Sequence, residues 1–147
     1  VASHNLLQNS LFKLKKAKKK NGDASVINIA SMYGTVSPNL SIYESELASN
    51  PPFYGASKAA LIQWTKYTAC ELAKYGIRVN SISPGAFPTK LVKNSSPNLY
   101  KKIIEKSPLH RVGLPEDLIG PAVFLASSSA GFVTGVNLPV DGGWTAW

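Results

Sequence analysis

The sequence predicts an α/β fold in which helices cover a parallel sheet. Helical and strand-like segments alternate along the 147 residues, and this order is typical of parallel strands joined by right-handed crossovers. The strand-like segments are short, rich in β-branched residues and bounded mostly by glycine or proline. Hydrophobic residues make up 44% of the chain and charged residues 16%, which indicates a globular protein with a packed core.

The first elements are a helix, a strand and a long loop. Residues 3–20 carry leucine and phenylalanine at helical spacing, and Gly22 stands just beyond their lysine-rich end, as expected for a helix terminus. The run "SVINIAS" (25–31) is apolar and β-branched, which predicts a strand that is buried on both faces. Residues 32–50 contain "SPNLS" and "ASNPP" and are predicted to be a loop.

A second helix is predicted from Pro51 and Pro52 to a stop at Gly76. Proline suits the first helical position, and glycine is the usual residue just past a helix end. This helix contains Cys70, the single cysteine of the chain, which we expect to be a small buried residue. One cysteine excludes an internal disulfide and is typical of a reducing compartment.

The remaining elements complete the alternation. "IRVNSIS" (77–83) is the next predicted strand, and a short helix is expected around residues 98–106. Pro115 and the two acidic residues that follow it predict the start of another helix. Pro121 is expected to kink that helix, because proline removes a hydrogen bond at a cost of ~3 kcal/mol. "GVNLPVDGG" (135–143) is predicted to be a last strand and turn.

Three strands form an incomplete sheet of this type. Each edge strand would leave backbone groups unpaired and one apolar flank uncovered. The chain also begins inside a predicted helix with no strand before it. We therefore expect residues 1–147 to be a single partial domain, the second half of a larger α/β fold.

The net charge of +8 is concentrated in "KLKKAKKK" (13–20), which holds six of the sixteen basic residues. Such a run can bind nucleic acid or an anionic membrane surface. No aromatic residue interleaves with these lysines to stack on bases, so we expect a solvated helix end. No apolar run reaches the ~20 residues that span a bilayer, and together with the single cysteine this favours a cytoplasmic protein. His4 and His110 have no partner at metal-ligand spacing, so no metal site is expected.

Tyr54 and Lys58 lie four residues apart in the stretch "FYGASKAAL" and should share one helix face. A free tyrosine has a pKa near 10 and transfers protons poorly at neutral pH. An ammonium ~4 Å away, at an effective dielectric constant of ~20, favours the phenolate by roughly 4 kcal/mol. This corresponds to about three pKa units before desolvation is subtracted. The pair could therefore act as a general acid and base.

Two further motifs stand at the carboxyl ends of predicted strands, where open α/β sheets bind ligands. Ser31 ends the first strand and could donate a hydrogen bond to a substrate carbonyl. "SISPGAFPT" follows the second strand, where Gly85 permits close backbone approach and Thr89 could hydrogen-bond a planar amide. With Tyr54, the sequence predicts one site at this edge of the sheet.

These motifs together resemble the short-chain dehydrogenase/reductase family. The matching segments are, in family order, "INIAS", "YGASK", "IRVNSISPG", "PT" and "FLASSSAGFVTGVNLPVDGG". The resemblance implies a Rossmann-like, doubly wound fold, of which this chain supplies the second, catalytic half. It also implies reversible hydride transfer between a nicotinamide cofactor and a carbonyl/alcohol pair. The family's glycine-rich turn has no counterpart in this chain, so NAD and NADP are not distinguished.

The resemblance assigns roles to individual residues. Tyr54 would be the general acid/base, Lys58 would lower its pKa and bind the nicotinamide ribose, and Ser31 would hold the reacting oxygen. Contacts to the nicotinamide end of the cofactor would come from Pro84, Gly85, Phe87 and Thr89. The family places a relay asparagine on the helix before the serine strand; Ser3 stands near that position, and we nominate Asn5, two residues away.

The segment between Ser31 and Tyr54 is longer than in many relatives and carries Tyr43, Glu44 and Glu46. We expect it to lie over the substrate pocket. It is similar to a loop of reductases that act on sugar-derived intermediates of bacterial surface polysaccharides; a 3-oxoacyl or small-ketone substrate is the alternative.

The family also implies a homodimer or homotetramer, formed through the helices at 3–20 and 52–75 and the last strand. Rival interpretations are a catalytically inactive fragment and a basic anion-binding module.

Overall fold

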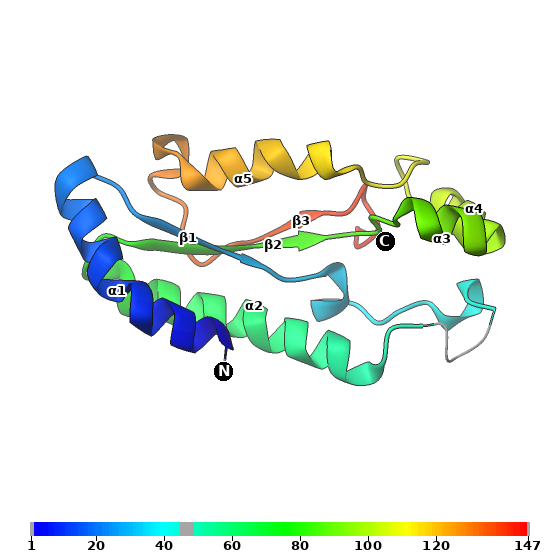
Figure 1. Ribbon diagram of the computed structural model, residues 1–147, viewed down its shortest axis with the longest axis horizontal. Helices are drawn as coiled ribbons and strands as arrows, with labels where there is room; N and C mark the ends of the chain where they lie inside the picture. The colour runs from blue at the N-terminus through cyan, green and yellow to red at the C-terminus, as the bar shows by residue number, and fades with distance from the viewer. Residues whose placement is uncertain (1, 45–48, 147) are drawn as a thin grey trace.

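The computed structural model describes residues 2–44 and 49–146, and it contains a three-stranded parallel sheet between two layers of helices (Figure 1). The strands are β1 (Ser25–Ile29), β2 (Arg78–Pro84) and β3 (Asn137–Val140), in the order β1-β2-β3. β1 and β2 pair with Ile27 opposite Asn80, and β2 and β3 pair with Ile82 opposite Leu138. The predicted α/β fold with a parallel sheet is confirmed.

The helices lie on both faces of the sheet and beyond its carboxyl ends. Figure 1 shows the two long helices along one face, α5 along the other, and two short helices where the strands end. Their bounds are α1 Ala2–Asn21, α2 Pro52–Ala73, α3 Lys90–Ser95, α4 Pro97–Lys106 and α5 Ile119–Ala126. Among the described residues, none of these helices has both the length and the apolar character needed to cross a bilayer.

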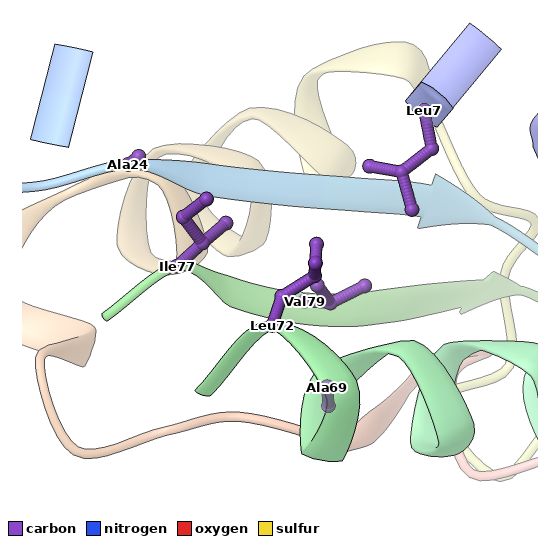
Figure 2. Packing of buried hydrophobic residues seen from close by; sticks show 6 residues of the cluster. All are labelled: Leu7, Ala24, Ala69, Leu72, Ile77 and Val79. Carbon is purple, nitrogen blue, oxygen red and sulfur yellow. The ribbon is translucent and has the colours of Figure 1, made fainter. Parts of the chain in front are cut away.

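Two hydrophobic clusters hold these layers on the sheet. On one face, Leu7 of α1 and Leu72 of α2 pack against Val79 of β2 (Figure 2). On the other face, Ile82 of β2 packs against the fully buried Leu125 of α5. Because side chains alternate along a strand, β2 supplies residues to both clusters. β2 is accordingly buried almost throughout, although four of its seven residues are polar or charged.

α1 ends as the sequence predicts. Three lysines stand in its last turn, and Gly22 just beyond it has φ +77°, the left-handed conformation that favours glycine. Lys18 Nζ donates to the Gly22 carbonyl oxygen at 2.6 Å. Lys15 Nζ lies 3.7 Å from the centroid of the Tyr75 ring, so an aromatic side chain from beyond α2 does reach the lysines. Part of the basic run is thus engaged within the chain.

Two expectations about burial are wrong. β1 was predicted to be buried on both faces, but its residues are half-buried and Ile29 is 53% exposed. In the described chain β1 is an edge strand that pairs with β2 alone, so its outer side has no cover. Cys70 was expected to be buried, but it is exposed on α2. The buried face of α2 instead runs through Ile62, Thr65 and Ala69.

The helix predicted to start at Pro115 begins later than expected. Pro115–Leu118 form a 3₁₀ turn, and α5 begins after it at Ile119. Pro121 therefore lies in the first turn of α5, where a backbone N–H has no partner within the helix. Proline costs no helical hydrogen bond at this position, so the expected penalty for a proline inside a helix does not apply.

A buried ion pair joins the amino-terminal ends of β1 and β2. Arg78 is 6% exposed, and its Nη2 lies 2.7 Å from Asp23 Oδ2. The same guanidinium donates to the carbonyl oxygens of Leu125 at 2.8 Å and Ser127 at 3.1 Å. Arg78 thus connects the sheet to the end of α5. The hydrogen bonds from Arg78 hold the pKa of Asp23 below its usual value of 3.8.

We expect this ion pair to make folding stability depend on acid. Because the pKa of Asp23 is lower in the folded state, its contribution is complete above the unfolded value of about 3.9. It is lost as the pH falls through the lower folded value. Urea denaturation measured across this window should show falling midpoints, and Asp23→Asn should flatten the dependence. An unchanged pH profile in that variant would contradict the assignment.

Candidate active site

A pocket of ≈ 380 Å³ opens at the carboxyl ends of β1 and β2, where the loops and short helices of Figure 1 gather. It brings together five residues that the sequence assigns to one site. These are Ser31, Tyr54, Gly85, Phe87 and Thr89. Other lining residues, which the sequence analysis did not single out, are Tyr33, Asn50 and Trp144. Lys58 and Pro84 stand beside this pocket in the chain but are not among its described lining residues.

Ser31 is positioned by the turn that follows β1. It caps the 3₁₀ turn Met32–Gly34, and its Oγ accepts a hydrogen bond from the Tyr33 backbone N–H at 3.2 Å. Ser31 is buried, so its hydroxyl has little access to bulk water. Because the oxygen already accepts from the backbone, the hydroxyl proton remains available to donate into the pocket.

Tyr54 and Lys58 occupy successive turns of α2, which Pro51 and Pro52 begin. Both side chains are half-buried. Lys58 Nζ donates to the Ile29 carbonyl oxygen at 2.9 Å, which ties α2 to the end of β1. The same nitrogen lies 5.7 Å from the centroid of the Tyr54 ring. The ammonium is therefore held beside the phenol rather than released into solvent.

Two glycines let the Ser31 turn lie directly on α2. A Cβ at Gly34 would come within 2.8 Å of the Lys58 carbonyl carbon and 3.0 Å of the Ala59 nitrogen. A Cβ at Gly55 would come within 2.8 Å of the Tyr33 carbonyl oxygen. The sequence analysis missed this role, although each glycine directly follows a tyrosine, Gly34 after Tyr33 and Gly55 after Tyr54 in "YGASK".

We expect Gly34→Ala to separate the serine from the tyrosine. The added methyl group meets the backbone of α2, which cannot rotate away, so the turn must shift at a cost of about 1–3 kcal/mol. Turnover per folded molecule should also fall, because the serine and the tyrosine no longer face the same point. Gly120→Ala is the matched control, because a Cβ there meets nothing within 4 Å. Activity and urea denaturation of both variants check the prediction, and equal behaviour of the two would contradict it.

The loop after the serine turn forms another wall of the pocket, as predicted. Ile42 is 1% exposed and packs with Ile103 of α4. Next to it, the Tyr43 hydroxyl lies 2.9 Å from the Tyr33 hydroxyl. Glu44 is exposed, and Glu46 lies outside the described residues. The described part of the predicted loop is therefore anchored in a hydrophobic cluster through Ile42.

The end of β2 supplies the opposite wall. A Cβ at Gly85 would come within 2.5 Å of Asp141 Cα, so the backbone just after β3 lies directly against this position. Thr89 is exposed at the start of α3, and its side chain makes no capping hydrogen bond. The Phe87 ring packs against the Gly113 backbone, where a Cβ would meet it at 2.5 Å.

Asn5, the nominated relay residue, is not brought into this site. It is exposed on α1 and is not among the described residues that line the pocket. Ser3, the other position considered, is half-buried on the same helix and is likewise not among them. The relay function of Asn5 stays a prediction. The C-terminal Trp144 packs in the cluster of Ile42, while Trp147 lies outside the described residues.

Comparison with known proteins gives consistent matches over nearly the whole chain. The family profile described as enoyl-(acyl carrier protein) reductase matches residues 8–145. A galactitol 2-dehydrogenase (L-tagatose-forming) of Cereibacter sphaeroides is 36% identical over 134 residues, which cover 90% of this chain and 50% of the relative.

Solved structures match in fold as well as in sequence. A short chain dehydrogenase from Leptospira borgpetersenii with bound NAD+ is 40% identical, with a TM-score of 0.76 over 92% of this chain and 50% of that one. A gluconate 5-dehydrogenase from Burkholderia cenocepacia in complex with NADP and tartrate is 29% identical, with a TM-score of 0.81 over 98% of this chain and 52% of that one.

The chain spans about half the length of the curated relatives that it matches. Its parallel sheet corresponds to about half of their Rossmann-like fold. The profile match covers far more than half of the present sequence, and the solved structures match it at high TM-score. The chain therefore belongs to the short-chain dehydrogenase/reductase family.

Proposed function

We propose that this chain is the catalytic half of an NAD(P)-dependent oxidoreductase that interconverts a carbonyl and an alcohol on a sugar-derived substrate. The observation that supports this most is the shared pocket of Ser31 and Tyr54, with the Lys58 ammonium held beside the tyrosine. These are the groups that carbonyl reduction needs, because negative charge develops on the carbonyl oxygen and must be neutralised by a proton.

Each residue has a distinct task in the proposed reaction. Ser31 donates a hydrogen bond from its hydroxyl to the substrate oxygen and so polarises the carbonyl, while keeping its own proton. Tyr54 delivers a proton to the same oxygen in reduction and removes it in oxidation. Lys58 places its positive charge beside the Tyr54 ring, close to where the proton is transferred. The bound cofactor supplies the hydride in reduction and accepts it in oxidation.

The residues around the pocket suit the nicotinamide end of such a cofactor. Lys58 would bind the ribose, and the Pro84-Gly85 turn, Phe87 and Thr89 would line the ring and its amide. The Thr89 hydroxyl, exposed and free of a capping bond, is a suitable partner for a planar carboxamide. The relatives described above include one structure with NAD+ and one with NADP, and both remain candidates.

The substrate assignment rests on the long loop and on the relatives. The loop forms a wall of the pocket through Tyr43, and the matched relatives include galactitol and gluconate dehydrogenases. A 3-oxoacyl thioester is the second candidate, because a structural relative is a 3-oxoacyl-[acyl-carrier protein] reductase from Brucella melitensis. A small ketone is the third.

We further propose a homodimer or homotetramer. Leu6 and Phe12 of α1 and Phe53 of α2 are all strongly exposed. Burial of such side chains against a second copy would remove apolar surface from water.

One assay tests the function. The intact protein is incubated with NADH or NADPH and, in turn, with a ketose, a 3-oxoacyl thioester and cyclohexanone, and consumption of reduced nicotinamide is followed. Cofactor-dependent reduction of the ketose supports the proposal, while preference for the thioester favours the second candidate. Salt-sensitive binding of DNA with no response to either cofactor would support the basic anion-binding module and contradict an oxidoreductase.

A further inference from the structure

We propose that the hydroxyl pair of Tyr33 and Tyr43 determines substrate specificity by binding a hydroxyl group of an uncharged, polyhydroxylated carbonyl compound. This inference rests on the proposed function, since it concerns the same pocket and names the chemistry of its substrate. It adds two residues to the site that the family motifs do not contain.

The pair is a built part of the pocket. Tyr33 is buried, and its hydroxyl lies 2.9 Å from that of Tyr43. Tyr33 is held at both ends, because its backbone N–H donates to Ser31 Oγ while its ring reaches the loop. Both tyrosines line the pocket that also contains Ser31 and Tyr54. The pair therefore lies on the wall of the pocket in which the carbonyl of the substrate would react.

The hydrogen-bonding capacity of the pair matches an alcohol. When one phenol donates to the other, one phenolic proton and several acceptor lone pairs are left over. A substrate hydroxyl can both donate and accept hydrogen bonds, so it can pair with the remaining phenolic proton and with one of the phenolic lone pairs. Burial above all, and then the neighbouring Tyr43 and Tyr54, raise the pKa of Tyr33 above its ordinary value of 10.0, so Tyr33 stays neutral. A hydrocarbon substrate would displace water from the two phenols without offering them a hydrogen bond. This loss would weaken its binding.

The charge of the lining excludes a different class of substrate. None of the described residues that line this pocket is charged. A second pocket of ≈ 750 Å³, which shares Tyr33, Asn50 and Tyr54 with the first, likewise has no charged residue in its described lining. Lys58 is not among the described residues that line either pocket. A carboxylate would lose its hydration here without gaining a counter-ion, so a neutral ketose should bind better than its keto-acid.

The test compares three carbonyl compounds in the intact protein with its cofactor. The probes are neutral pentuloses and hexuloses, keto-aldonates of the same chain lengths, and cyclohexanone, which has no hydroxyl group. Wild type should prefer the ketoses to the keto-aldonates. Tyr43→Phe should lower kcat/KM for the ketoses by about twofold to twelvefold, mainly through KM, since one neutral hydrogen bond is lost. Cyclohexanone should react as in wild type.

Two further arms separate binding from structure and from chemistry. Tyr67→Phe, which removes an exposed phenolic hydroxyl outside the pocket, should change none of these values. Calorimetric binding of the corresponding polyols, with and without Tyr43→Phe, needs no hydride transfer. Polyol binding that weakens in Tyr43→Phe would uphold the tyrosine pair even if no compound is reduced, in which case only the proposed function fails. Equal losses for ketose and cyclohexanone, or preferred keto-aldonates, would overturn the inference.

Discussion

Tyr54→Phe is expected to lower kcat by about 10²–10⁴-fold, the usual contribution of a general acid or base. The substitution removes the proton that the reacting oxygen must receive and leaves the ring that packs in the pocket. Cofactor affinity should change little, because Lys58 keeps its bond to the Ile29 carbonyl and does not depend on the phenol for its position. Steady-state turnover measures the first effect, and quenching of tryptophan fluorescence by NADH or NADPH measures the second.

The control is again Tyr67→Phe on the exposed side of the same helix. It deletes the same atom from the same type of residue and should retain full turnover. If Tyr54→Phe kept turnover within a few fold of wild type, another group would have to supply the proton, and the proposed chemistry would be wrong.

Arg78→Met is expected to produce the largest loss of folding stability, about 3–5 kcal/mol. Methionine fills similar volume, but it leaves the Asp23 carboxylate without its partner and removes the donors of two carbonyl groups at the end of α5. Because Asp23 is 30% exposed, water can reach it, and the loss should fall toward the lower end of this range. The free energy of unfolding from urea denaturation checks the value.

Arg111→Met provides the matched comparison. Arg111 also pairs with a carboxylate, that of Asp117, at 2.6 and 2.8 Å, but its side chain is 50% exposed. Exposed pairs contribute about 0–1 kcal/mol, so this variant should lose much less stability. Similar losses in the two variants would show that burial does not set the strength of the Arg78 pair.

The sequence predicts those elements whose signals are local. A helix from Pro52 to a stop at Gly76 and a strand at 77–83 are predicted from proline, glycine and apolar residues, and the structure has them at Pro52–Ala73 and Arg78–Pro84. Burial of β1 was predicted wrongly, because a β-branched run does not reveal whether a neighbouring strand covers it. The sequence does not reveal which face of α2 is buried, because apolar residues occur all around the helix. In the structure, Ala56 and Ala60 are exposed, while the polar Thr65 is buried.

The same division holds for the site. Ser31, Gly85 and Thr89 could be placed together because the carboxyl ends of parallel strands share one edge. The contact between Tyr33 and Tyr43 depends on how an irregular loop folds back, which no periodic pattern encodes. The need for glycine at position 34 depends on the distance between a turn and a helix, which appears only in three dimensions.

The anchoring of the loop has a consequence for how this protein could acquire new substrates. Ile42 fixes the Tyr43 wall from beneath through Ile103, a residue of α4 that belongs to no reaction step. Changes in the size of that support would move the wall while leaving Ser31, in the turn after β1, and Tyr54, on α2, in place. Selectivity and chemistry can therefore evolve separately in this protein, and α4 is where redesign of its substrate range should begin.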